Sequence, residues 1–494
     1  MDIVINLQPI YDFLNLPPDI ILMKIFWAVG WIPIAVTFVW GGAKLWLFYI
    51  QKRWTTAQPK ILLAIDIPRG NMQSPKAVEN IFAYLAGAHD TQDLFEKWWL
   101  GVIQHVFSFE IVSIDGYIQF LIRTAERFRN LVESAIYSQY PDAEITEVND
   151  YTTGYPLLFP DEQYDIWGSE FIQVKKSFYP IKTYKDFEHP FGEPETQYKD
   201  PMAALMDLMS SMKKGEQIWY QLIAKPIGVE WAEEADREVK KIIGEKVPAS
   251  NNFIDVMINT FLGWLDSFSE FVYKSGVEKN EMTKQEEQRF LMMNLKPKQK
   301  KQIEAIQEKV GGVGFQFKLR FIYLAKKEMM NKHKAANGFI GYMKQFNTND
   351  LNSIKPDTGS GGTATKIQYP IFFNTRLNTR KRKIMRRYID RDTAAGRTPG
   401  ILNTEELSSI WHFPIESVVR APLMQKAPGR KAEPPSNLSF VKEGAEAGLP
   451  FEEKTATPVP DIFREEIKEE RVGNELAVDV AAKKGLPPEN LPFV

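Results

Sequence analysis

The chain has 494 residues, of which 44% are hydrophobic, so it is long enough for two or three domains with substantial cores. Its 61 Lys and Arg residues against 63 Asp and Glu residues give a net charge of -2. No global field therefore draws it to nucleic acid, and any such attraction must be local. The chain has no cysteine, which excludes disulfides, thiolate metal sites and thiol nucleophiles.

The first predicted element is a transmembrane helix. Residues 25–43 carry no charged side chain, and a helix of this length spans roughly 28 Å, close to the roughly 30 Å hydrocarbon thickness of a bilayer. Trp46, Tyr49 and Trp54 follow it, where interfacial anchors are expected, and more lysines and arginines follow the helix than precede it. A cleaved signal peptide and a buried core helix are the alternatives.

This reading predicts a single-pass protein of the cell membrane. Residues 25–49 form the transmembrane helix, and residues 1–24 form an extracytoplasmic segment. Because positively charged flanks favour the cytoplasmic side, we expect the bulk of the chain to be cytoplasmic. Membrane lipid is then its first partner.

Residues 60–153 are predicted to form a first α+β unit. Residues 60–68 are typical of a strand, and residues 107–122 alternate apolar and polar side chains around a tight turn at Asp115-Gly116. Apolar residues between Phe128 and Ile136 then recur at helical spacing. A helix packed on an antiparallel sheet is a ferredoxin-like arrangement.

Residues 154–215 are predicted to be an irregular insertion that ends in a Met-rich helix, and residues 216–433 a second α+β unit. The second unit would contain a helical insertion, in which residues 251–276 form a buried helix or one at the membrane surface, then a basic segment and a closing helix. Residues 434–494 are rich in Pro, Gly and Glu and are predicted to be an acidic, disordered tail.

The fold class is therefore α+β. One N-terminal transmembrane helix precedes two ferredoxin-like units with helical insertions and a disordered C-terminal tail.

No motif in the sequence predicts catalysis. The stretch "GSGGTATK" at 359–366 lacks the Gly-Lys-Ser/Thr ending of a P-loop, and the five histidines have no metal-ligand spacing. We therefore expect no catalytic residue, no cofactor and no metal site.

Residues 376–391 form the strongest charge cluster in the chain. Nucleic-acid phosphate, anionic lipid or the acidic tail could neutralise it, and a solvated helix face is the alternative. The candidate residues for binding nucleic acid or another anion are Arg380, Lys381, Arg382, Lys383, Arg386, Arg387 and Arg391.

Two apolar helix faces are candidates for docking a partner. Met202, Met206 and Met209 share one face of the Met-rich helix, which suits either core packing or an adaptable docking surface. The stretch "LNTEELSSIWHFP" at 402–414 predicts a helix capped by Asn403, with Leu407 and Trp411 on its apolar edge. We expect this helix to pack on the second α+β unit and to close the domain.

Four stretches of the sequence resemble stretches of a known protein family, where they occur in the same order. They are "FSFEIVSIDGYIQFLIRT", "FRNLVESAIYSQYPDAEITEVNDYT", "GFIGYMKQFNTNDLNSIKPD" and "LNTEELSSIWHFP". Together they resemble the membrane-anchored N-terminal region of bacterial type IV secretion or conjugative DNA-transfer ATPases, over most of residues 60–440. In that family a P-loop motor follows the last stretch. Here an acidic tail stands in its place, so no ATPase residue is carried over and we expect the motor on a separate chain.

The resemblance implies an accessory or docking module of a type IV secretion or conjugative DNA-transfer assembly, which works with a separate P-loop ATPase and can form a homo-oligomer. An alternative is a membrane-tethered nucleic-acid-binding protein, with DNA held by residues 376–391. A third hypothesis is an unrelated membrane-bound enzyme.

Overall fold

The computed structural model describes residues 15–67, 71–187, 200–244, 295–359, 361–368 and 370–415. The predicted helix at 251–276 and the predicted tail at 434–494 lie outside these residues. Most of the predicted extracytoplasmic segment, residues 1–14, also lies outside them.

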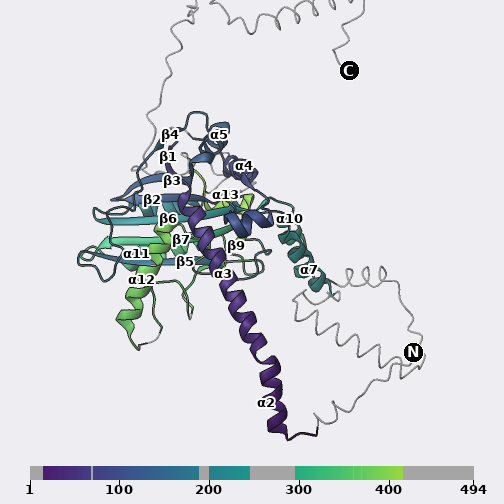
Figure 1. The fold of residues 1–494 in the computed structure, drawn as a ribbon. Helices are drawn as coiled ribbons and strands as arrows, with labels where there is room; N and C mark the ends of the chain where they lie inside the picture. The colour runs from purple at the N-terminus through teal and green to yellow at the C-terminus, as the bar shows by residue number, and fades with distance from the viewer. Residues whose placement is uncertain are drawn as a thin grey trace, which may run out of the picture. The chain divides into compact units, whose positions relative to one another are not determined.

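An antiparallel sheet of nine strands forms the framework of the described residues (Figure 1). Its order is β4-β1-β3-β2-β6-β7-β5-β8, and β9 pairs with β7 beyond the end of β5. The strands are β1 (Lys60–Asp66), β2 (Phe107–Ile114), β3 (Tyr117–Ala125), β4 (Glu144–Glu147), β5 (Tyr164–Gln173), β6 (Glu216–Pro226), β7 (Gly314–Lys326), β8 (Ile354–Pro356) and β9 (Gly400–Asn403).

The same strand order occurs twice in this sheet. The first four strands take the order β4-β1-β3-β2, and the next four take the order β8-β5-β7-β6. In each half a helix follows the first strand and another follows the third: α4 (Pro75–Leu85) and α5 (Arg129–Gln139), then α6 (Met202–Ser210) and α11 (Lys332–Lys344). The two halves join because β2 pairs with β6 from Phe107 opposite Ala224 to Ile114 opposite Gln217.

These strands confirm the predicted α+β class, with one difference in the second half. Strand β5 lies inside the segment predicted to be irregular. It lies between β7 and β8, and its residues Gly168, Ser169, Glu170 and Phe171 are all buried. A strand covered on both faces loses the alternation by which strands are recognised.

One face of the sheet is covered by five helices that share a single hydrophobic core. Helices α4, α5, α6 and α11 pack there with α13 (Thr404–Ile410) on the alternate strand residues, such as Phe109 and Leu222. Because successive side chains of a strand point to opposite faces, Glu110 and Gln221 lie on the other face.

The second face is covered by α12 (Phe373–Asp390) and by the segment around Phe159. Ile384, Met385 and Tyr388 of α12 pack on strand residues such as Trp219. Helices α7 (Trp231–Ile243) and α10 (Pro297–Val310), which follow β6 and precede β7 in the chain, form a smaller hydrophobic cluster with Phe178. The short helical turns are η1 (Ala86–Ala88), η2 (Glu96–Leu100), η3 (Glu126–Phe128) and η4 (Tyr184–Phe187).

Two helices precede the sheet in the chain, α2 (Pro18–Val29) and α3 (Trp31–Ala57). Pro33 has no backbone N–H to donate to Val29, which accounts for the interruption between them at Gly30. The predicted span of residues 25–43 therefore covers the end of α2 and the start of α3, and α3 continues 14 residues beyond Ala43, to Ala57.

Candidate functional site

Helix α3 has the length and composition of a membrane-spanning helix over Ile34–Ala57. Its large apolar side chains point outward, and Phe38 is 77% exposed. Val39, Trp40 and Leu45 are exposed as well. This exposure disfavours the alternative of a buried core helix, whereas a signal sequence near the N-terminus would show the same properties.

The three predicted interfacial aromatics lie on the C-terminal half of α3. Trp46 and Tyr49 are exposed, and their ring centroids are 6.3 Å apart. The Trp46 indole Nε1 donates a hydrogen bond to the carbonyl oxygen of Trp98, 3.0 Å away, in η2. Trp54 lies 5.7 Å from the guanidinium of Arg127. Sequence reasoning missed η2, although the adjacent tryptophans in "LFEKWWL" were a visible signal.

The predicted basic cluster is not a uniform cationic surface. Lys381 is buried and forms an ion pair with Asp165. Arg391 is also buried, and it donates to both carboxylate oxygens of Glu110, at 2.9 and 3.1 Å. These two residues therefore hold α12 to the sheet and do not present charge to a ligand, which corrects their assignment as anion-binding residues.

The other members of the cluster differ in their exposure. Arg380 is half-buried and donates to the carbonyl oxygen of Ala364, and Arg387 is half-buried too. Arg382, Lys383 and Arg386 are exposed, although Arg382 Nε also donates to the carbonyl oxygen of Phe159, 2.7 Å away. The exposed charge of α12 is thus smaller than the sequence indicates.

A row of buried polar side chains crosses the sheet beneath α12. Glu110, Gln221, Arg320 and Glu170 lie directly opposite one another on β2, β6, β7 and β5. Gln221 donates to Glu110 at 3.1 Å, and Arg320 donates to Gln221 at 3.2 Å and to Glu170 at 3.1 Å. The row crosses the β2–β6 junction, so it links the two halves of the sheet.

Every carboxylate in this row has protein donors. Glu110 also accepts from Tyr151 Oη at 2.8 Å, and the Tyr151 and Tyr388 hydroxyls are 2.7 Å apart. Burial alone would raise the pKa of Glu110, but the Arg391 guanidinium holds it below its usual value. The row is therefore a satisfied structural network that offers no open acid or base.

A pocket of about 490 Å³ lies beside this row, between β5, β7 and residues 397–400. Burial lowers the pKa of Lys318 in its wall to about 8, and Lys318 Nζ donates to the carbonyl oxygen of Ala395. Lys175 Nζ donates to two backbone carbonyls, and Arg397 pairs with Asp357. Because these three cations already have partners within the protein, their charges do not indicate which kind of ligand the pocket would bind.

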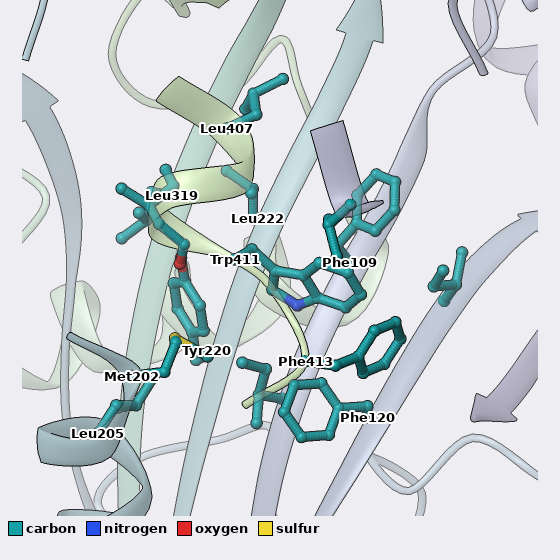
Figure 2. Close-up of a cluster of buried hydrophobic side chains, with 14 of the residues drawn as sticks. Phe109, Phe120, Met202, Leu205, Tyr220, Leu222, Leu319, Leu407, Trp411 and Phe413 are labelled. Atoms are coloured by element: carbon teal, nitrogen blue, oxygen red, sulfur yellow. The ribbon is translucent and has the colours of Figure 1, made fainter. Parts of the chain in front are cut away.

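The five predicted docking residues lie in the core. Met202, Met206, Met209, Leu407 and Trp411 are all fully buried. Figure 2 shows Trp411 beside Phe109 and Phe413, with ring centroids 5.0 and 5.2 Å away. These residues therefore pack in the core and do not form a docking surface, because the sheet covers the apolar faces of both helices.

The predicted capping box of the closing helix is confirmed. Asn403 accepts a hydrogen bond from Glu406 N, and the Glu406 carboxylate accepts one from Asn403 N. Helix α13 packs against α4 of the first half as well as on the second half, which differs from the predicted packing on the second unit alone.

Among the described residues, no group of three or more His, Asp and Glu side chains could hold a metal ion. A family model described as a domain of unknown function (DUF8128) matches residues 64–426. No curated protein matches the chain.

Proposed function

The chain belongs to the DUF8128 family, a domain of unknown function. We propose that its role is positional: α3 anchors the α+β domain at a membrane, and the domain is an accessory or docking module there. The anchor is proposed to be a single pass in the cell membrane, with the domain on the cytoplasmic side. Lys52, Arg53 and Lys60 on the domain side support this orientation.

The exposed apolar surface of α3 is the observation that carries this proposal. Phe38, Trp40 and Leu45 are each more than half exposed. Removing such a side chain from water is worth about 1.5–3 kcal/mol. A bilayer supplies that burial for the whole helix at once, whereas an aqueous environment would leave it exposed.

The chemistry of the domain favours a scaffold over an enzyme. Glu110 forms an ion pair with Arg391, and Glu170 forms one with Arg320. A catalytic acid or base needs a free position within hydrogen-bond reach of a substrate. These buried groups do not offer one.

We further propose that each half of the sheet is a ferredoxin-like unit. Each half has the order of strands 4-1-3-2, and the helices that follow its first and third strands pack in the same hydrophobic core. The two units share one sheet through β2 and β6.

The proposed assembly is of the type IV secretion or conjugative DNA-transfer kind, and the proposed partners are a P-loop ATPase and further copies of this chain. The resemblance of residues 107–124 and 402–414 to the region ahead of such motors supports this part of the proposal.

The experiment is a pull-down of the tagged chain from native membranes in mild detergent, with copurifying chains identified by mass spectrometry. The expected result is stoichiometric recovery of a P-loop ATPase. Recovery of the protein alone, in detergent that preserves known membrane complexes, would contradict the docking role. The intact mass of the purified chain checks the anchor, since removal of residues 1–43 would identify a cleaved signal sequence.

A nucleic-acid-binding role is the second candidate, because Arg376, Lys383 and Arg386 on α12 are exposed. Replacing these three residues with Gln should reduce, by about three, the slope of the logarithm of the DNA-binding constant against the logarithm of the salt concentration. The matched control replaces Lys298, Lys300 and Lys301 on α10. Unchanged DNA affinity in the α12 variant would exclude the role.

A further inference from the structure

Residues 94–100, "LFEKWWL", expose five apolar side chains next to the charged Glu96 and Lys97, and the proposed function does not involve them. The side chains of Leu94, Phe95, Trp98, Trp99 and Leu100 are all exposed, and Trp99 is 68% exposed. The rings of Phe95 and Trp99 stack at an angle of 18°, with their centroids 6.4 Å apart. A contiguous exposed apolar surface of this kind marks contact with another molecule.

This surface is fixed against α3. Trp46 Nε1 donates to the carbonyl oxygen of Trp98 at 3.0 Å. Gly101 follows with a φ of +70°, and a Cβ at this position would lie 2.5 Å from the backbone carbonyl carbon of Ile50. The chain at residue 101 therefore touches the backbone of α3, which requires glycine.

With the uncharged run of residues 25–43 in the hydrocarbon core, as proposed for the anchor, the contact with α3 lies at the depth of a membrane interface. The uncharged run of residues 25–43 ends at Lys44, and Lys52 and Arg53 follow. Trp46 and Ile50 lie roughly 3 and 9 Å beyond Lys44 along the helix, at about 1.5 Å per residue. Amphipathic segments that lie on membranes bury their apolar side chains about 5–10 Å into the boundary between headgroups and acyl chains.

We propose that residues 94–100 lie in the interface of the bilayer that α3 crosses, with Phe95, Trp99 and Leu100 inserted among the lipids. The inference rests on the proposed membrane anchor. Tryptophan suits this position because its ring is apolar and its N–H is polar. The domain is then held by two membrane contacts, a spanning helix and an interfacial segment, which restricts its tilt relative to the bilayer.

The absence of cysteine makes the test direct. The single variants are Trp99→Cys, Val39→Cys on α3 and Tyr117→Cys at the start of β3, and all three replaced side chains are exposed. Tyr117 pairs with Ile114 at the far end of β2, about 23 Å from the start of that strand at 3.3 Å per residue. Each variant of the full chain carries an environment-sensitive fluorophore in vesicles of phosphatidylcholine and phosphatidylglycerol, with nitroxide lipids that quench near the glycerol backbone or at the chain end.

The expected result is that the shallow nitroxide quenches the label at position 99, that both nitroxides quench the label at position 39, and that neither quenches the label at position 117. Quenching at 39 but not at 99 overturns the inference and leaves the anchor standing. Quenching at 99 but not at 39 contradicts the anchor, and the inference with it, because the proposed interface is that of the bilayer that α3 crosses. Quenching at neither position overturns both.

Discussion

His105 is a half-buried histidine whose hydrogen bond from Ala125 requires the neutral form. Its Nε2 accepts from the backbone N–H of Ala125 at 3.2 Å, and its ring packs on Phe107 and Phe128. Burial lowers the pKa of His105 to about 3, with smaller contributions from Arg127 and Lys60. Protonation would remove the acceptor and place a charge beside two aromatic rings.

This shift predicts a loss of stability in mild acid. Because the folded pKa is lower than the unfolded value near 6.5, the unfolded state binds more protons below pH 6.5, so stability is complete above that pH and falls as pH falls toward 3. His105→Gln keeps an acceptor for Ala125, and between pH 7 and pH 5 it should lose about 2 kcal/mol less stability than the wild type. Urea unfolding in detergent micelles measures this difference.

The exposed His333 provides the matched control. His333→Gln should keep the wild-type difference in unfolding free energy between the two pH values. If His105→Gln also keeps it, His105 does not account for the acid sensitivity.

At the scale of elements, a buried ion pair joins α10 to α13. Lys309 Nζ lies 2.8 Å from Glu406 Oε2, and both side chains are almost completely buried. Lys309 also donates to the carbonyl oxygen of Ile401, and Glu406 accepts from Ile181 N. Burial lowers the pKa of Lys309 and raises that of Glu406. The capping carboxylate of α13 therefore also holds a helix from the insertion between β6 and β7.

Removing one partner of this pair should be costly. Lys309→Met leaves the Glu406 carboxylate buried without its cation, so we expect a loss of about 3–5 kcal/mol in unfolding free energy. The double variant Lys309→Met, Glu406→Gln removes that charge and should recover part of the loss. Urea unfolding midpoints of both variants measure the effect. If Lys309→Met is as stable as the wild type, the ion pair does not contribute to the stability of the domain.

The whole domain depends on a seam between its two halves. The β2–β6 pairing and the row from Glu110 to Glu170 cross this seam on the sheet. On the helical face, Trp411 from the end of the second half packs on Phe82 and Phe109 of the first. The two halves therefore share one core and are expected to unfold together.

Trp411→Ala tests this coupling. A large cavity at the seam should cost about 3–5 kcal/mol and lower hydrogen-exchange protection equally in β2 and β7. Trp411→Phe is the matched control with a smaller loss, because the indole N–H has no hydrogen-bond partner among the described residues. Loss of protection confined to one half would contradict a shared core.

Features set by neighbouring residues could be predicted from the sequence. The turn at Asp115-Gly116 has positive φ at both residues, and the Asn403–Glu406 capping box forms as expected. The apolar helix near the N-terminus follows from an uncharged run alone. In each case the interactions that determine the structure lie within a few residues, so the local sequence contains them.

Tertiary structure decided which predicted site residues face outward. The ion pairs of Lys381 with Asp165 and Arg391 with Glu110 join residues more than 200 positions apart, so the sequence shows the cations without their partners. The methionines of α6 and Trp411 of α13 lie in the hydrophobic core that both halves share. A helix pattern reveals an apolar face, but only the packed sheet determines whether that face is in the core or available to a partner.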